Sequence, residues 1–101
     1  MNEKTENSAY HILLVEDNRT QAEYLRRLLE KKEHIVTVCS NGYDALNKVR
    51  EDKPDIILTD IMMPDMDGFS LCKKLKQEKT TSKIPVILVT HLYSPIDVIK
   101  G

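Results

Sequence analysis

Acidic residues follow two apolar segments of this 101-residue chain, and a hydroxyl residue ends a third segment. Glu16 and Asp17 follow the first segment, Asp60 ends the second, and Thr90 ends the third. Carboxylates that lie close together repel one another, so either their pKa values rise or a cation sits among them. A site of oxygen ligands suits Mg²⁺, which binds carboxylates together with waters and phosphate oxygens. The acids therefore indicate a magnesium site, provided that the fold brings them together.

Short strands and amphipathic helices must alternate for that to happen, and the sequence predicts this alternation. Short apolar runs favour strands of a parallel sheet that helices cover on both faces. These runs are residues 11–15, 35–39, 56–60 and 85–90. Apolar residues at helical spacing predict helices after the first three runs. We expect these helices from Arg19, after the turn Asn41-Gly42, and after the loop 61–68, with a further helix start at Ser94-Pro95.

Ligands of an open parallel α/β sheet bind beyond the carboxyl ends of its strands. If the first and third strands are neighbours, Glu16, Asp17 and Asp60 share one crevice. A single acid at a strand end is usually an ordinary cap or loop residue. Three acids and the Thr90 hydroxyl at corresponding ends of three strands favour a functional site instead.

Composition restricts the class of protein. The chain has 41% hydrophobic residues, a net charge of −1 and two cysteines without CxxC spacing. The length of 101 residues predicts one domain, and the hydrophobic fraction is enough to form its core. The small net charge argues against strong electrostatic binding to nucleic acid or to an anionic membrane. We find no apolar run of the roughly 20 residues that a membrane span needs. Isolated cysteines favour reduced thiols, so we expect a cytoplasmic protein.

The stretch Asp60-Ile-Met-Met-Pro-Asp-Met-Asp-Gly68, with Glu16-Asp17 before it and Thr90 after it, resembles the receiver domain of two-component response regulators. The resemblance implies a flavodoxin-like three-layer α/β sandwich with a parallel sheet in the order 2-1-3-4, in which the fifth strand and its helix are missing. We therefore expect a receiver domain over residues 11–101, incomplete at its C-terminus, and a flexible tail over residues 1–10.

The family resemblance implies a role for each acid. Asp60 would accept a phosphoryl group from a phosphohistidine, and a magnesium ion would offset charge on the transferred oxygens. Asp17, Asp60 and the backbone carbonyl of Met62 would bind the metal directly, and Glu16 would act through a water. Thr90 would then turn toward the new phosphoryl group and switch an interaction surface. This is a phosphoacceptor rather than an enzyme, since any self-phosphorylation or dephosphorylation concerns its own Asp60.

Neighbouring residues have simpler interpretations. Pro64 and Gly68 would shape the loop after Asp60, with Gly68 supplying backbone angles that few residues tolerate. We interpret Met62, Met63 and Met66 as flexible packing residues. Asp65 and Asp67 are expected to be ordinary loop acids, and Cys39 and Cys72 to lie in the core. Five lysines are expected on a solvated face: Lys73, Lys74, Lys76, Lys79 and Lys83. The histidines make no metal-spaced pair, and residues 79–83 form a polar exposed link.

Two departures from the family pattern limit what the resemblance implies. His91 follows Thr90, where the family usually has a small residue. The family's active-site lysine belongs to the fifth strand, and no lysine of this chain can be assigned to that position. An uncovered fourth strand would expose Ile84, Ile87 and Leu88 and invite pairing with another chain. We therefore expect the chain to form a homodimer through that edge, to borrow an element of a partner, or to be only marginally stable.

Three functions remain open at this point. The leading hypothesis is a signalling receiver whose partners are a sensor histidine kinase or phosphotransfer protein and a downstream protein or missing output domain. A magnesium-dependent phosphatase or phosphotransferase is the second, but the position two residues after Asp60 is Met62 instead of a second aspartate. The third is a receiver-fold interaction module, or a truncated fragment, that phosphate does not switch.

Overall fold

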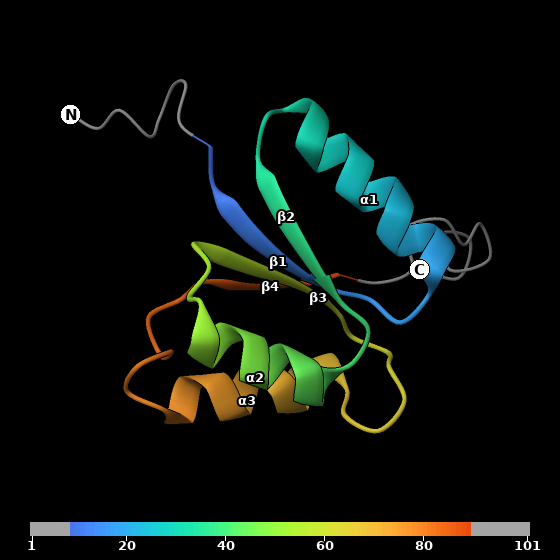
Figure 1. Ribbon diagram of the computed structural model, residues 1–101. Coiled ribbons are helices and arrows are strands. Elements are labelled where there is room, and N and C mark those ends of the chain that lie inside the picture. The colour runs from blue at the N-terminus through green and yellow to red at the C-terminus, as the bar shows by residue number, and fades with distance from the viewer. Residues whose placement is uncertain (1–8, 90–101) are drawn as a thin grey trace.

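The structure is a computed structural model and describes residues 9–89. Strands and helices alternate along these residues (Figure 1). They are β1 (His11–Val15), α1 (Arg19–Lys31), β2 (Ile35–Cys39), α2 (Gly42–Glu51), β3 (Ile56–Asp60), α3 (Gly68–Gln77) and β4 (Val86–Val89). The strands form one parallel sheet in the order β2-β1-β3-β4, which confirms the predicted three-layer architecture and strand order.

Helices cover the two faces of the sheet unequally. In Figure 1, α1 lies on one face while α2 and α3 lie together on the other. Successive residues of a strand point to opposite faces, so β1 is buried on both sides. Its alternate residues Leu13 and Val15 join the core beneath α2 and α3, and Ile12 and Leu14 face the α1 layer.

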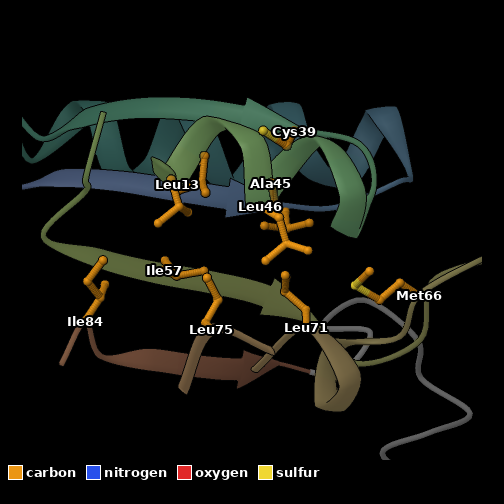
Figure 2. Packing of buried hydrophobic residues seen from close by; sticks show 11 residues of the cluster. Leu13, Cys39, Ala45, Leu46, Ile57, Met66, Leu71, Leu75 and Ile84 are labelled. Carbon is orange, nitrogen blue, oxygen red and sulfur yellow. The ribbon is translucent and has the colours of Figure 1, made fainter. Parts of the chain in front are cut away.

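The main hydrophobic core lies between the sheet and the helices α2 and α3 (Figure 2). Ala45 and Val49 of α2 and Leu71 of α3 are fully buried against Ile57 of β3. Full burial of an aliphatic side chain contributes roughly 1.5–3 kcal/mol, so this layer anchors both helices firmly to the sheet. The loop before α3 adds Met66 to the same core.

Side-chain caps determine where the helices begin. Asn18, Asn41 and Asp67 each accept a hydrogen bond from the backbone N–H three residues later, over 2.9, 2.8 and 2.8 Å. Such a cap satisfies one of the otherwise unpaired N–H groups of the first turn. The chain bends at residues 40–41, as the Asn41-Gly42 pair predicted, and the same pair caps and begins α2.

The connection between α3 and β4 is more buried than the sequence suggested. Thr81 is fully buried and its Oγ1 donates to the Leu75 carbonyl over 2.6 Å. Lys76 is exposed, as predicted for a solvated face, and it also donates from Nζ to the carbonyls of Ser82 and Ile84 over 3.1 and 2.7 Å. Ile84, predicted to be exposed, belongs to the core. These contacts fasten the start of β4 to the end of α3.

Some predicted exposures are confirmed, others are wrong, and some predictions fall outside residues 9–89. Ile87 is exposed and Leu88 is partly buried, while Cys39 lies in the core and Cys72 is only half-buried. Tyr10, expected in the tail, donates its N–H to Nδ1 of His34 over 3.2 Å. Thr90, His91 and the predicted helix start at 94–97 lie outside the described residues. No helix within residues 9–89 is long and apolar enough to cross a membrane.

Candidate metal centre

The three predicted acids meet at one edge of the sheet. Strands β1 and β3 are hydrogen-bonded neighbours in parallel register, with Val15 opposite Thr59. Glu16, Asp17 and Asp60 therefore leave the same end of adjacent strands, and one carboxylate oxygen from each lies within 4.8 Å of the others. Within the described part of the chain, this is the single group of at least three His, Cys, Asp or Glu residues that is close enough to hold a metal ion.

Burial makes this group of acids electrostatically costly. Asp60 is 1% exposed and Glu16 is 3% exposed, whereas Asp17 faces solvent. Burial of the Glu16 carboxyl, together with the negative charges of Asp60 and Asp17, raises the pKa of Glu16 to about 7. Desolvation and like charge both disfavour the ionised form. A cation among the acids would offset both effects.

Backbone N–H groups orient two of the carboxylates. The Asn18 N–H donates to Oε2 of Glu16 over 3.0 Å, and the Met62 N–H donates to Oδ1 of Asp60 over 3.2 Å. The other oxygen of Asp60, Oδ2, is buried and has no hydrogen-bond partner among the described residues. An unpaired buried carboxylate oxygen is costly unless a cation or another donor meets it. The donor set of three carboxylates fits Mg²⁺.

Gly68 closes the loop after Asp60 by close approach rather than by an unusual backbone angle. Its φ is not positive, so the predicted reason for this glycine is wrong. A Cβ at position 68 would lie 2.5 Å from the Asp60 carbonyl oxygen and 3.0 Å from Cα of Ile61. The Gly68 N–H also donates to the Ile61 carbonyl over 2.9 Å. Only a residue without a side chain fits against the site's backbone here.

Pro64 lies in a tight turn of the same loop. Its carbonyl accepts the Met66 N–H over 2.7 Å, and Asp65 between them has a φ of 68°. A hydrogen bond from residue i+2 back to residue i closes a three-residue turn. The left-handed angle falls on Asp65, a residue type that tolerates it better than most.

The loop acids and methionines do not join the acid group. Asp67 caps α3 through the Ser70 N–H, which confirms its interpretation as a loop acid. Met66 is 4% exposed and packs in the core, whereas Met62 is 65% exposed. Sequence reasoning missed two residues near the site: Asn18 donates its backbone N–H to Glu16, and Gly42 packs on Met66 of the loop after β3. The Asn-Gly pattern before a helix could have indicated a cap at Asn41, but nothing in it indicated the contact with Met66.

A groove of about 640 Å³ adjoins the acid group. It runs from Glu16 and Asp17 past Arg19 and Cys39 to Lys48. The lining carries charges of both signs, so the groove as a whole does not resemble an anion pocket.

Comparison with known proteins identifies the family. Residues 12–101 match the family model of the response regulator receiver domain. The response regulator PleD of Caulobacter vibrioides is 43% identical over 90 residues, which cover 89% of this chain and 20% of PleD. This chain thus spans about a fifth of that relative's length.

Two solved structures are also similar. The receiver domain of a signal transduction histidine kinase from Syntrophus aciditrophicus is 42% identical, with a TM-score of 0.79 over 91% of this chain and 70% of that one. The receiver domain of the sensor histidine kinase PA1611 from Pseudomonas aeruginosa is 27% identical, with a TM-score of 0.76 over 80% of this chain and 66% of that one. The PA1611 structure has a magnesium ion coordinated in its active-site cleft.

Proposed function

Because this chain belongs to the response regulator receiver domain family, we propose that it accepts a phosphoryl group on Asp60 in two-component signal transduction. The observation that carries the proposal is Oδ2 of Asp60, which is buried, lacks a hydrogen-bond partner among the described residues, and lies beside two further acids. A carboxylate held in this way is available as a nucleophile. The donor would be a phosphohistidine of a sensor histidine kinase or of a phosphotransfer protein.

Asp17, Asp60 and the Met62 backbone carbonyl are the proposed magnesium ligands, with Glu16 acting through a water. The PA1611 receiver, which coordinates magnesium in its active-site cleft, supports this choice of ion. When bound, the ion would offset negative charge on the carboxylates and on the phosphoryl oxygens.

The chain's own residues supply the acceptor and its orientation. A carboxylate oxygen of Asp60 forms the new P–O bond while the P–N bond of the phosphohistidine breaks, and the imidazole leaves with the electron pair of that bond. The Met62 N–H holds Oδ1 of Asp60 and thereby fixes the direction of the carboxylate plane. Positioning of this kind is the main contribution that a protein makes to phosphoryl transfer.

Partners and output follow from the same premise. Both similar structures are receiver domains of histidine kinases, whereas PleD is a response regulator, so this receiver fits a phosphorelay in either context. Thr90 remains the proposed switch residue, acting on a downstream protein or output domain. We propose that the chain is a phosphoacceptor rather than an enzyme with a separate substrate. A cytoplasmic location agrees with its two free cysteines.

A homodimer through β4 remains a prediction. Strand β4 pairs with β3 on one side, and its other side carries no strand among residues 9–89. Unpaired strand edges favour pairing with another chain. Light scattering of the 101-residue chain tests this prediction, and a monomer at all concentrations would contradict it.

Intact mass spectrometry tests the proposed function. The chain is incubated with Mg²⁺ and acetyl phosphate, beside Asp60→Asn and the loop-acid control Asp65→Asn, with circular dichroism to confirm folding. We expect one phosphoryl adduct on the wild type and on Asp65→Asn, and none on Asp60→Asn. A folded wild-type chain without an adduct, or an adduct that survives Asp60→Asn, would overturn the assignment.

A further inference from the structure

Gly42, outside the acid group, contacts the loop that carries Met62, whose backbone carbonyl is a proposed metal ligand. It begins α2, is buried, and faces Met66 of the loop between β3 and α3. A Cβ built at position 42 would lie 2.7 Å from Sδ of Met66 and 3.1 Å from its Cβ and Cγ. The two residues are therefore in contact, with no room for one more methyl group.

Both sides of this contact are held in place. The helix that carries Gly42 is fixed by Ala45 and Val49, which are fully buried in the core. Met66 is 4% exposed, so its side chain has little free space into which it can move. Its Sδ can rotate, but its Cβ moves only with the backbone. Rotation of Sδ therefore relieves only part of the overlap, and a larger residue at position 42 shifts the backbone at Met66 by a few tenths of an ångström.

The loop transmits that displacement to the proposed site. The Met66 N–H bonds to the Pro64 carbonyl over 2.7 Å, which makes residues 64–66 one tight turn. The Gly68 N–H bonds to the Ile61 carbonyl over 2.9 Å and closes the loop at its base. Met62 lies between these two fixed points, and its N–H is the donor to Oδ1 of Asp60. A shift of the turn thus reaches Met62 within two residues.

We propose that Gly42 is a positioning residue for the phosphoacceptor site. Because Gly42 has no side chain, Met66 can pack against α2 and fix the loop, and the fixed loop keeps the Met62 N–H in hydrogen-bond contact with Asp60. The magnesium measurement depends on the proposed function. The measurement on the Met62 N–H does not, because its hydrogen bond to Asp60 is part of the structure itself. Substitution of a residue that orients a metal ligand typically lowers metal affinity by about 10- to 100-fold.

The experiment compares the full chain with Gly42→Ala, Met66→Ala, the double variant, and Tyr43→Ala. Tyr43 is exposed on the same turn of α2 and serves as the control. Hydrogen exchange of the Met62 amide is measured without metal, Mg²⁺ affinity by calorimetry, and folding by circular dichroism. We expect Gly42→Ala to speed Met62 exchange and to weaken Mg²⁺ binding about tenfold. The double variant should regain most of both, because the new methyl group occupies space that the thioether vacates.

Each outcome decides the inference. A folded Gly42→Ala variant whose Met62 amide exchange rate and Mg²⁺ affinity equal those of the wild type would overturn the inference. A double variant that does not recover the slow exchange and the Mg²⁺ affinity would overturn it too. If Gly42→Ala does not fold, Met66→Ala decides: unseating the loop should also speed Met62 exchange, and a wild-type rate would overturn the inference. A wild type that binds no Mg²⁺, with exchange changed in the variants, would contradict the proposed function and leave the positioning role supported.

Discussion

Glu16 and Asp60 each place a carboxylate oxygen within 4.8 Å of the other, and both side chains are almost completely buried. One of them belongs to the segment after β1 and the other ends β3, so the pairing of two central strands forces the two acids together. Two buried negative charges at this separation disfavour each other, so without a cation the Glu16 carboxyl holds its proton up to a pH of about 7, its raised pKa.

The first prediction is that the metal-free protein loses stability as the pH rises. Burial and the nearby charges of Asp60 and Asp17 raise the pKa of Glu16 from 4.5 to about 7. Between these values the folded chain keeps a proton that the unfolded chain releases, so the free energy of unfolding falls as pH increases. The contribution is present below pH 4.5 and lost by about pH 7. Its upper bound is about 3 kcal/mol.

Urea unfolding at several pH values measures this dependence. Glu16→Gln, which cannot ionise, should flatten the profile in that window, and saturating Mg²⁺ should raise the wild-type stability at neutral pH. A wild-type profile without a slope between pH 4.5 and 7 would show that Glu16 does not carry the effect.

The second prediction compares two glycines. At position 68 an added Cβ meets the Asp60 carbonyl oxygen at 2.5 Å, whereas at position 42 the nearest atom is Sδ of a methionine. Backbone cannot yield as a thioether does, so Gly68→Ala should lose about 1–3 kcal/mol. Gly42→Ala should lose less, because rotation of the Met66 thioether relieves most of the overlap, whereas any gain in helix propensity is shared by two glycines that each begin a helix. Chemical denaturation of both variants gives the comparison, and equal losses would contradict it.

The third prediction separates a cap from a ligand. Asp67→Ala should lower the free energy of unfolding by about 0.5–2 kcal/mol, since it removes the acceptor for the Ser70 N–H. It should leave Mg²⁺ affinity close to that of the wild type, because Asp67 is not part of the acid group. Calorimetric titration beside Asp65→Ala checks this. A large loss of affinity in Asp67→Ala alone would place Asp67 in the metal centre.

The fourth prediction concerns the connection between α3 and β4. Thr81→Val removes the hydroxyl that donates to the Leu75 carbonyl and leaves that carbonyl only the longer bond of 3.4 Å from the Glu78 N–H, which should destabilise the protein by about 0.5–1.5 kcal/mol. The neighbouring Thr80 is exposed, so Thr80→Val is a matched control and should stay within about 0.5 kcal/mol of the wild type. Thermal unfolding of both variants distinguishes them, and similar midpoints would count against a role for the hydroxyl.

The sequence predicted the strands from local patterns, and it predicted the meeting of the acids from the rule that sites of parallel sheets lie beyond the carboxyl ends of neighbouring strands. A run such as His11–Val15, apolar at every position after the first, suits a central parallel strand. An acid directly after such a strand lies at the carboxyl edge of the sheet, where ligands bind.

Contacts between distant side chains could not be predicted in this way. Nothing local to Gly42 indicates Met66, and Thr81 looks like an ordinary polar residue of a lysine-rich link. The prediction that Gly68 supplies an unusual backbone angle was wrong for the same reason. A side chain is excluded at position 68 because the Asp60 backbone passes beside it, and this contact exists only in the folded chain. Burial and closeness depend on three-dimensional packing, whereas caps and periodicity depend on neighbours in sequence.

The central position of β1, between β2 and β3, has a consequence for folding kinetics. Glu16 and Asp60 are remote along the chain and meet only after the β1–β3 pairing closes, which is the slow kind of contact in folding. An ion that needs both acids binds the native state and not the unfolded chain, so it slows unfolding far more than it speeds folding. A newly synthesised chain whose central strands have not yet paired therefore lacks the acid group. If the proposed function is right, only molecules that have finished folding could be phosphorylated.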